Sequence, residues 1–227
     1  MKRMFILLGC FILTAGMAGI LLAKPVEAQQ TTLTSIEQLG EMLYFDENLS
    51  EPNGQSCASC HDPAFGFDDP DDNLPVSQGV IPTLFGGRNS PASSYAMYAP
   101  DFYFNEEDGL WIGGQFWDGR ATGNALGDPL ADQAVGPFLN PVEMANPNKL
   151  TVLQDISYKE LFKEVWPGTD LDNLGSMTDE EINTAYNQIG LAIAAFERTQ
   201  LFGQFSSKYD AYLNKCLDAG GTTTDCA

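Results

Sequence analysis

Apolar residues recur at helical spacing in the first polar stretch of the chain. Ile36, Leu39 and Leu43 lie three or four positions apart, and this spacing places them on one face of a helix. The four residues that begin at Ser35 have the pattern of a capping box, which marks a helix N-terminus. We therefore expect a short helix that begins at Ser35 and ends near Phe45.

The longest helical pattern covers residues 178–199. It opens with a capping box in which Thr178 is followed by Glu181, and one apolar stripe runs along it: Ile182, Ala185, Ile189, Ala192 and Phe196. Strand patterns of useful length do not occur in the sequence, so the predicted fold class is mainly α. Shorter helices are predicted over residues 128–138, 157–165 and 205–213.

The segment between residues 62 and 108 has a different character. An acidic turn around Pro70 and several glycines interrupt it, and it contains six prolines: Pro63, Pro70, Pro75, Pro82, Pro91 and Pro100. Regular helices and central strands do not tolerate so many prolines. Long irregular loops inside a compact domain are usually functional, so we expect this segment to wrap a binding site.

The N-terminus has the pattern of an export signal. Lys2 and Arg3 precede an uncharged run over residues 5–23, and small residues end at Ala28, so residues 1–28 are predicted to be a signal peptide cleaved after Ala28. The protein would then be periplasmic. The run is close to the ~18 apolar residues that let a helix span a bilayer, so an uncleaved membrane anchor is the alternative.

The net charge of the chain limits the classes of macromolecule that it is expected to bind. It carries 31 Asp and Glu against 11 Lys and Arg, a formal net charge of −20, which disfavours nucleic acid and favours a basic protein partner. Hydrophobic residues make up 44% of the chain, enough for an ordinary core. A single histidine occurs in all 227 residues, which excludes a metal site built from several histidines.

That histidine belongs to the most informative motif of the sequence. Cys57, Cys60 and His61 form the C-x-x-C-H pattern of covalent c-type haem attachment. Two thiols at this spacing can form thioethers with the two vinyl groups of haem, while the imidazole ligates the iron. A redox-active C-x-x-C, a zinc site and a structural disulfide are the alternatives.

Two further cysteines lie near the C-terminus. Cys216 and Cys226 are separated by a loop rich in glycine and threonine. In an oxidising compartment we expect them to form a disulfide that closes this loop, with free or metal-binding thiols as the alternative.

The sixth position of a haem iron decides what the protein does. A methionine sulfur there would make an electron carrier, and the candidates are Met97, Met144 and Met177. An open position would let peroxide bind and be cleaved if a proton-transfer group lies nearby. Composition does not choose between the two.

Several motifs of the chain belong together and follow one another in a fixed order. They occupy the segments 39–46, which leads into 57–63, and then 87–91, 115–121, 133–137, 140–144 and 196–199. In this order they resemble the bacterial di-haem cytochrome c peroxidase family, which includes the quinone-cofactor maturation enzymes, and the resemblance spans about residues 35–213. It implies a cytochrome c-like haem domain in which the N-terminal haem reacts with peroxide, and a second domain whose haem supplies electrons.

The resemblance also implies roles for single residues. Cys57 and Cys60 would attach the haem, and His61 would be the proximal ligand of the iron. Glu143 would be the acid and base that moves a proton between the peroxide oxygens. Gln133 would lie on the same distal face and position peroxide or water.

Two more roles follow from the resemblance. Trp117 would lie on the electron path to the second haem, and Asn89 would contribute to a calcium site between the domains. Without the resemblance, an isolated Glu or Gln is usually a solvated surface residue and a Trp usually belongs to the core.

The sequence departs from the family pattern in two ways. Many members carry a distal histidine in the loop after the haem motif, whereas residues 75–80 of this chain contain none. The distal site is therefore expected to be open or filled by another group. The chain also ends at Ala227 without a second C-x-x-C-H, so we expect residues 29–227 to be the haem domain alone, as a fragment, a split gene product or a mono-haem variant.

Together these features predict an exported c-type haem enzyme that reduces hydrogen peroxide to water. Its cofactor would be one covalent haem c, and its electrons would come from a small basic cytochrome c or a similar donor. The alternatives are a mono-haem electron carrier with methionine on the iron and a fragment that binds haem without turnover.

Overall fold

The computed structural model describes residues 32–70 and 74–226. The chain divides into two units, residues 1–32 and 33–227, and every element described below belongs to the second. The predicted signal peptide over residues 1–28 lies outside the described residues. Among the residues that are described, no helix is long and apolar enough to cross a membrane.

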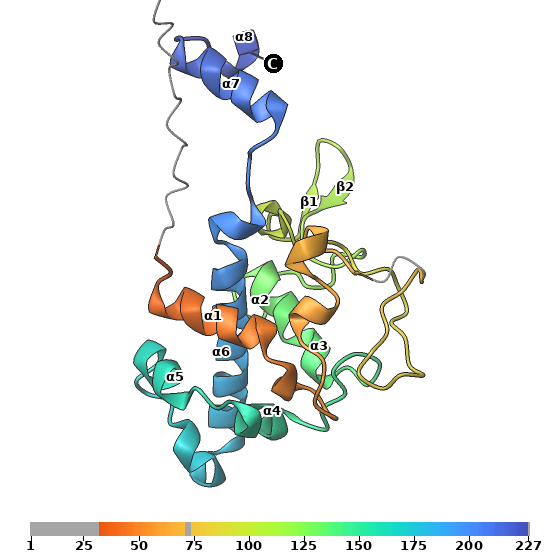
Figure 1. Ribbon diagram of the computed structural model, residues 1–227, viewed down its shortest axis with the longest axis vertical. Helices are drawn as coiled ribbons and strands as arrows, with labels where there is room; N and C mark the ends of the chain where they lie inside the picture. Colours follow the sequence, from red (N-terminus) through yellow and green to blue (C-terminus); the bar gives the residue numbers. More distant parts are fainter. Residues whose placement is uncertain (1–31, 71–73, 227) are drawn as a thin grey trace, which may run out of the picture. The chain divides into compact units, whose positions relative to one another are not determined.

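Two helices form the centre of the domain. α1 (Ser35–Phe45) lies across α6 (Asp179–Glu197), and α2 (Pro129–Ala134) packs on the same long helix (Figure 1). Gly40 on α1 faces the backbone carbonyl of Ala192 on α6, where a Cβ would have no room. The two backbones can approach so closely because Gly40 has no side chain.

Both predicted capping boxes exist, and one is shifted by a residue. At α6 the backbone N–H of Thr178 donates to the Glu181 carboxylate at 2.7 Å, as predicted. At α1 the N-cap is Thr34 rather than Ser35, and the Thr34 N–H donates to Glu37 Oε2 at 2.7 Å. Glu37 is the better partner because its carboxylate is charged and sits in the first turn, where the helix dipole favours an anion.

The helix predicted over residues 128–138 is two helices in the structure. α2 ends at Ala134, and α3 (Gly136–Leu139) follows after Val135. The single-helix prediction was wrong because Gly136 and Pro137 weaken the helix, and proline lacks the N–H that would continue it. This break lies between Gln133 and Glu143, the two residues with predicted catalytic roles.

The other helices are short. α5 (Lys159–Val165) occupies most of the predicted 157–165, whereas α4 (Lys149–Asp155) was not predicted. The last predicted helix was placed too early, because α7 (Lys208–Asp218) begins after the Ser207 cap, and α8 (Thr223–Cys226) follows it. The described 3-10 helices are Glu47–Leu49, Cys57–Ser59, Pro63–Phe65, Ala96–Tyr98, Leu171–Ser176 and Gln200–Phe202.

The long irregular segment is present, and at its C-terminal end the chain forms a hairpin that the sequence did not predict. β1 (Tyr103–Asn105) and β2 (Leu110–Ile112) form a two-stranded antiparallel hairpin. Each strand has three residues, which is too short for an alternating pattern to be recognised. The fold is mainly α, as predicted.

The core is continuous from α1 to α6. An aromatic cluster occupies its centre, and its rings are packed edge to face or stacked: Tyr44, Phe67, Phe196 and Phe202. Apolar residues of α4 and α5, such as Val152 and Phe162, extend it. The C-x-x-C segment packs directly against this core, since Cys57 and Ala58 contact it.

Candidate functional site

A cavity of about 470 Å³ lies between the haem motif, the irregular segment and the helices α2 and α6. This volume falls within the range of small-molecule and cofactor sites. The structure brings all of the predicted haem and catalytic residues to its wall, together with the residues predicted for electron transfer and calcium binding: Cys57, Cys60, His61, Glu143, Gln133, Trp117 and Asn89.

The C-x-x-C-H segment is held by its own backbone. The N–H of Cys60 and the N–H of His61 both donate to the Cys57 carbonyl, at 3.2 and 3.0 Å. Ser56 caps this 3-10 helix, and its N–H donates to Ser59 Oγ at 3.0 Å. The tight turn therefore presents both thiols and the imidazole to one cavity.

Both thiols of this segment are free. Burial raises the pKa of Cys57 and of Cys60, so neither is a thiolate at neutral pH. This is the opposite of what a redox-active C-x-x-C requires. In the described part of the chain, no group of three or more His, Cys, Asp or Glu side chains could hold a metal ion.

His61 is held once through its side chain and once through its backbone. Its Nε2 lies 3.4 Å from Ser90 Oγ, and the Tyr44 hydroxyl donates to the His61 carbonyl at 3.0 Å. Burial lowers the pKa of His61, and a contact with the Phe67 backbone partly offsets this effect. A neutral imidazole is the form that ligates iron.

Glu143 and Gln133 reach the cavity from different elements. Gln133 is carried by α2, and Glu143 lies in the turn after α3, where its N–H donates to the Asn140 carbonyl at 3.0 Å. Burial raises the pKa of Glu143, while Asn140 and the positive charge of Arg120 lower it in part. A half-buried carboxyl with a raised pKa is suited to general acid and base catalysis.

The loop that lacks the distal histidine supports Glu143 directly. The Val80 N–H donates to the Glu143 carbonyl at 2.9 Å, and Gly79 lies so close to the Val142 carbonyl that a Cβ would not fit. From this loop Ser77 and Gln78 line the cavity. The loop therefore contributes the hydroxyl of Ser77 and the amide of Gln78 to the cavity wall.

Two arginines and one aspartate form a charged group at the cavity. Asp118 accepts from Arg88 Nη1 at 2.6 Å and from Arg120 Nη1 at 2.9 Å. The Arg88 guanidinium and then Arg120 lower the pKa of Asp118 to about 2. Arg120 also lies over the Phe116 ring, 3.6 Å from its centroid. Sequence reasoning assigned no role to these residues, although all lie in segments that carried the family resemblance.

Trp117 and Asn89 are joined to each other at the edge of the same cavity. The indole Nε1 of Trp117 donates to the Asn89 carbonyl at 2.8 Å. The Trp117 side chain is 66% exposed, so it is a surface residue rather than part of the core. The calcium site at Asn89 stays a prediction.

The three candidate methionine ligands occupy different places. Met144 is buried and lines the cavity. Met177 packs against the main core, and Met97 packs against a smaller cluster that includes Leu130. Of the three, Met144 alone contributes to the cavity wall.

Glu197 is a member of the site that sequence reasoning missed. It is the last residue of α6 and lines the cavity, yet its side chain is only 5% exposed. Desolvation raises the pKa of Glu197 to about 8. The segment 196–199 is one of those that match the family, but the pattern of apolar residues around Glu197 does not indicate that its side chain is buried.

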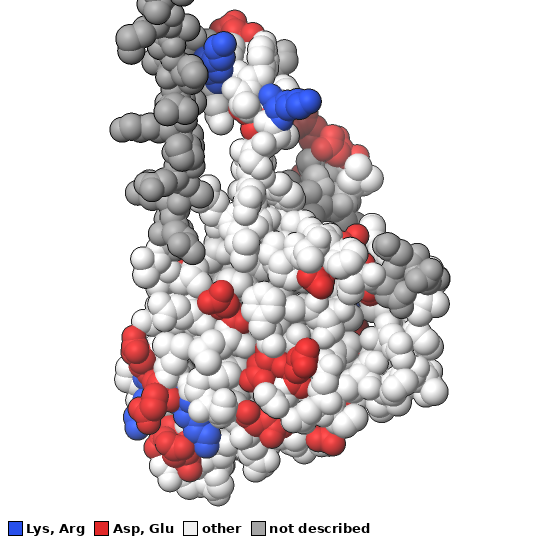
Figure 2. Space-filling model, in the orientation of Figure 1, with Lys and Arg blue, Asp and Glu red and all other residues white. Residues whose placement is uncertain are grey.

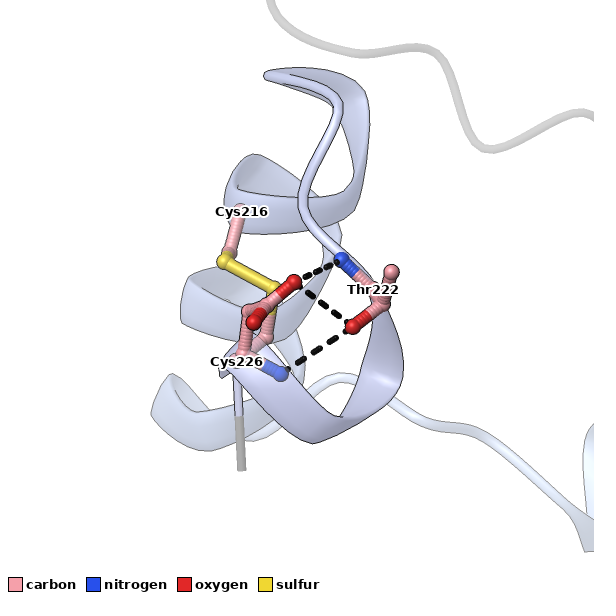
Figure 3. Close-up of a disulfide and its surroundings, with 4 residues drawn as sticks. Cys216, Thr222 and Cys226 are labelled. Atoms are coloured by element: carbon pink, nitrogen blue, oxygen red, sulfur yellow. Dashed lines mark hydrogen bonds between the residues drawn. A yellow bond between two sulfur atoms is a disulfide. The ribbon is translucent and has the colours of Figure 1, made fainter.

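The two C-terminal cysteines are paired in the structure. A disulfide joins Cys216 on α7 to Cys226 on α8, with their Cα atoms 5.8 Å apart (Figure 3). Thr222 starts the turn between them, and its N–H donates to the Asp225 carboxylate at 3.0 Å. The bond closes the loop that the sequence predicts.

Acidic side chains are spread over the surface that Figure 2 shows, with few basic ones among them. Asp155 belongs to one acidic group, since burial and the nearby carboxylates of Glu51 and Asp46 raise its pKa. This face therefore carries the negative potential expected from the composition.

The fold is similar to that of solved diheme peroxidases. The structure of the diheme peroxidase BthA from Burkholderia thailandensis superposes with a TM-score of 0.67 and 31% identity, over 80% of this chain and 42% of that one. The family model of the di-haem cytochrome c peroxidases matches residues 34–217. The chain belongs to this family.

Two curated relatives come from different branches of the family. The methylamine utilization protein MauG of Paracoccus denitrificans is 39% identical over 183 residues, which are 78% of this chain and 43% of that protein. The cytochrome c551 peroxidase of Nitrosomonas europaea is 33% identical over 210 residues, 91% of this chain and 52% of that protein. The chain thus spans about half the length of the curated relatives it matches.

Proposed function

We propose that this chain is a periplasmic haem c domain that reduces hydrogen peroxide to water. One observation carries the proposal: the two thiols and the imidazole of the C-x-x-C-H motif line the same cavity as Glu143 and Gln133. The segments that supply these groups are far apart in the sequence, so their meeting is a property of the fold. Membership of a peroxidase family supports the same activity.

The residues of the cavity fit a covalent haem. Cys57 and Cys60 are free thiols, as the addition of S–H across the vinyl groups of haem requires, and burial lowers the pKa of His61, which favours a neutral imidazole. Arg88 and Arg120 share the carboxylate of Asp118, and the group of three keeps one net positive charge at the cavity, which favours the carboxylates of a haem. Haem bound there would supply an iron on which peroxide can be held and reduced.

Within this proposal Glu143 handles the proton. As a carboxylate it accepts a proton from one peroxide oxygen and returns it to the other, which leaves as water. The amide of Gln133 holds peroxide or water by hydrogen bonds beside it. Complete reduction of one peroxide to two waters takes two electrons and two further protons, so an electron donor is part of the reaction.

We propose a small basic cytochrome c or a similar protein as that donor. The net charge of −20 favours a basic partner. Trp117 is exposed at the edge of the cavity and offers an aromatic group on the path of the electrons. Calcium bound near Asn89 would belong to the contact with a second haem domain of the family type.

A second function has one observation in its favour. Met144 lines the cavity, and its sulfur on the iron would make the protein an electron carrier that ignores small ligands. The variant Met144→Leu separates the two functions, because it preserves an apolar side chain of similar size and removes the sulfur.

The test is an optical spectrum of the haem-loaded chain, ferric and ferrous, before and after addition of cyanide and peroxide. A high-spin ferric haem that reacts at once supports the peroxidase. A low-spin haem that ignores both ligands, and becomes reactive in Met144→Leu, supports the carrier. Haem that binds cyanide while the protein consumes no peroxide identifies a domain without turnover. The control Cys57→Ser/Cys60→Ser should retain no haem after denaturation.

A further inference from the structure

Glu197 is a buried acid that the proposed peroxidase mechanism does not use. Its side chain lines the cavity, and its Oε2 is buried without a hydrogen-bond partner among the described residues. An isolated ionised carboxylate at such a site is costly, so a carboxyl group there stays protonated to a higher pH than usual. A carboxyl group therefore occupies a buried position at which an apolar side chain would lose less solvation free energy.

The charged neighbours of Glu197 do not neutralise it. Arg198 follows it in the chain, but the Arg198 guanidinium is bound to Asp128, with Nη1–Oδ2 at 2.7 Å and Nη2–Oδ1 at 2.8 Å. The positive charge of Arg198 lowers the pKa of Glu197 in part, whereas the negative charge of Asp128 raises it. The ion pair therefore satisfies its own two charges and leaves Glu197 with little net stabilisation.

The remaining titratable neighbours are Tyr44 on α1 and Cys57 of the haem motif. A negative charge on Glu197 would raise the pKa of both side chains, which places the carboxyl near the edge of the cavity that carries the Cys57 thiol. Cys57 loses its titratable proton once it forms a thioether, and the Tyr44 hydroxyl stays neutral. A change in the charge of a bound haem would thus change the pKa of Glu197, with no ion pair between them to offset it.

We propose that Glu197 is a redox-linked proton-binding group, which takes up one proton when haem in this cavity is reduced and releases it on oxidation. Reduction adds one electron from an external donor to the iron and one proton from solvent to the carboxylate, and oxidation returns both. Ferric haem carries one more positive charge than ferrous haem, and at a buried site this difference favours the carboxylate in the oxidised protein. This inference rests on the proposed haem site.

The proposed coupling between haem reduction and proton binding by Glu197 predicts how the midpoint potential changes with pH. The proton-binding constant of Glu197 is larger in the ferrous protein, so the midpoint potential falls as pH rises through the range between its two pKa values. The limiting slope is a tenfold change in the reduction equilibrium per pH unit, which is ~59 mV for a one-electron couple. Because desolvation already raises the pKa of Glu197 to about 8, the range should include mildly alkaline pH.

The experiment is a spectroelectrochemical titration of the haem-loaded full chain between pH 6 and 10. We expect the wild type to show the slope, and Glu197→Gln to have a potential that is independent of pH in that range. Glu41→Gln is the matched control: it removes an exposed carboxylate of α1 and should retain the slope. A slope that persists in Glu197→Gln, or a wild type without one, overturns the inference.

A second measurement keeps the test valid if Glu197→Gln does not fold. The infrared difference spectrum between ferric and ferrous protein should contain the C=O band of a carboxylic acid that appears on reduction. The band should shift on ¹³C labelling of glutamate and remain in Glu143→Gln, and its absence overturns the inference. Covalent haem with no redox-linked carboxyl refutes this inference alone, whereas a chain that attaches no haem refutes the proposed function as well.

Discussion

Replacing Tyr44 with Phe tests how the segment that carries His61 is held. The Tyr44 hydroxyl donates to the His61 carbonyl at 3.0 Å and lies 3.0 Å from Ser93 Oγ. The substitution keeps the ring among its aromatic neighbours and removes only these two hydrogen bonds. At ~0.5–1.5 kcal/mol for each bond, the free energy of unfolding should fall by about 1–3 kcal/mol.

Urea unfolding of the haem-loaded protein, followed by circular dichroism, measures this loss. Tyr212→Phe is the matched control, because Tyr212 is 56% exposed and its substitution should change the stability by less than ~0.5 kcal/mol. If Tyr44→Phe is as stable as the Tyr212 control, the two hydrogen bonds contribute nothing, and the account of how His61 is held fails.

Three further predictions concern the cavity and the helices around it. Glu143→Gln should retain covalent haem but lose peroxide turnover by ~10²-fold or more, and undiminished peroxide consumption would remove Glu143 from the mechanism. Gly40→Val should cost ~1–3 kcal/mol in thermal unfolding because its side chain meets the Ala192 carbonyl, and an unchanged Tm would contradict this packing. Glu197 binds its proton more tightly in the folded chain, with a pKa of about 8, so the stability should fall as pH rises from ~4.3, the usual value for Glu, to about 8. Glu197→Gln should abolish this decline, as urea titrations at several pH values would show.

Residues that act through their immediate neighbours could be predicted from the sequence. The spacing of Cys57, Cys60 and His61 fixes a local turn whose bonds all lie within a few residues. The box from Thr178 to Glu181 and the apolar stripe behind it define α6 in the same way. These features depend on hydrophobic periodicity and on hydrogen bonds between residues that are close in the sequence, so sequence patterns are sufficient to predict them.

Residues whose role depends on a distant partner escaped that analysis or came only from the family resemblance. The Ser35 cap was wrong by one position because two residues with suitable side chains compete there. The hairpin of β1 and β2 was missed because its strands are too short to show a pattern. Gln133 and Glu143 could be paired only by resemblance, since they belong to different elements, α2 and the turn after α3.

By itself, the sequence determined the mainly helical class, the haem motif and the acidic charge of this protein. Only the tertiary structure decided that Glu143, Gln133 and Glu197 share one cavity with the thiols and the imidazole. It also decided that Trp117 is exposed and Glu197 is buried. The physical reason is that secondary structure follows from neighbours along the chain, whereas burial and the pKa of a side chain depend on groups that only folding brings together.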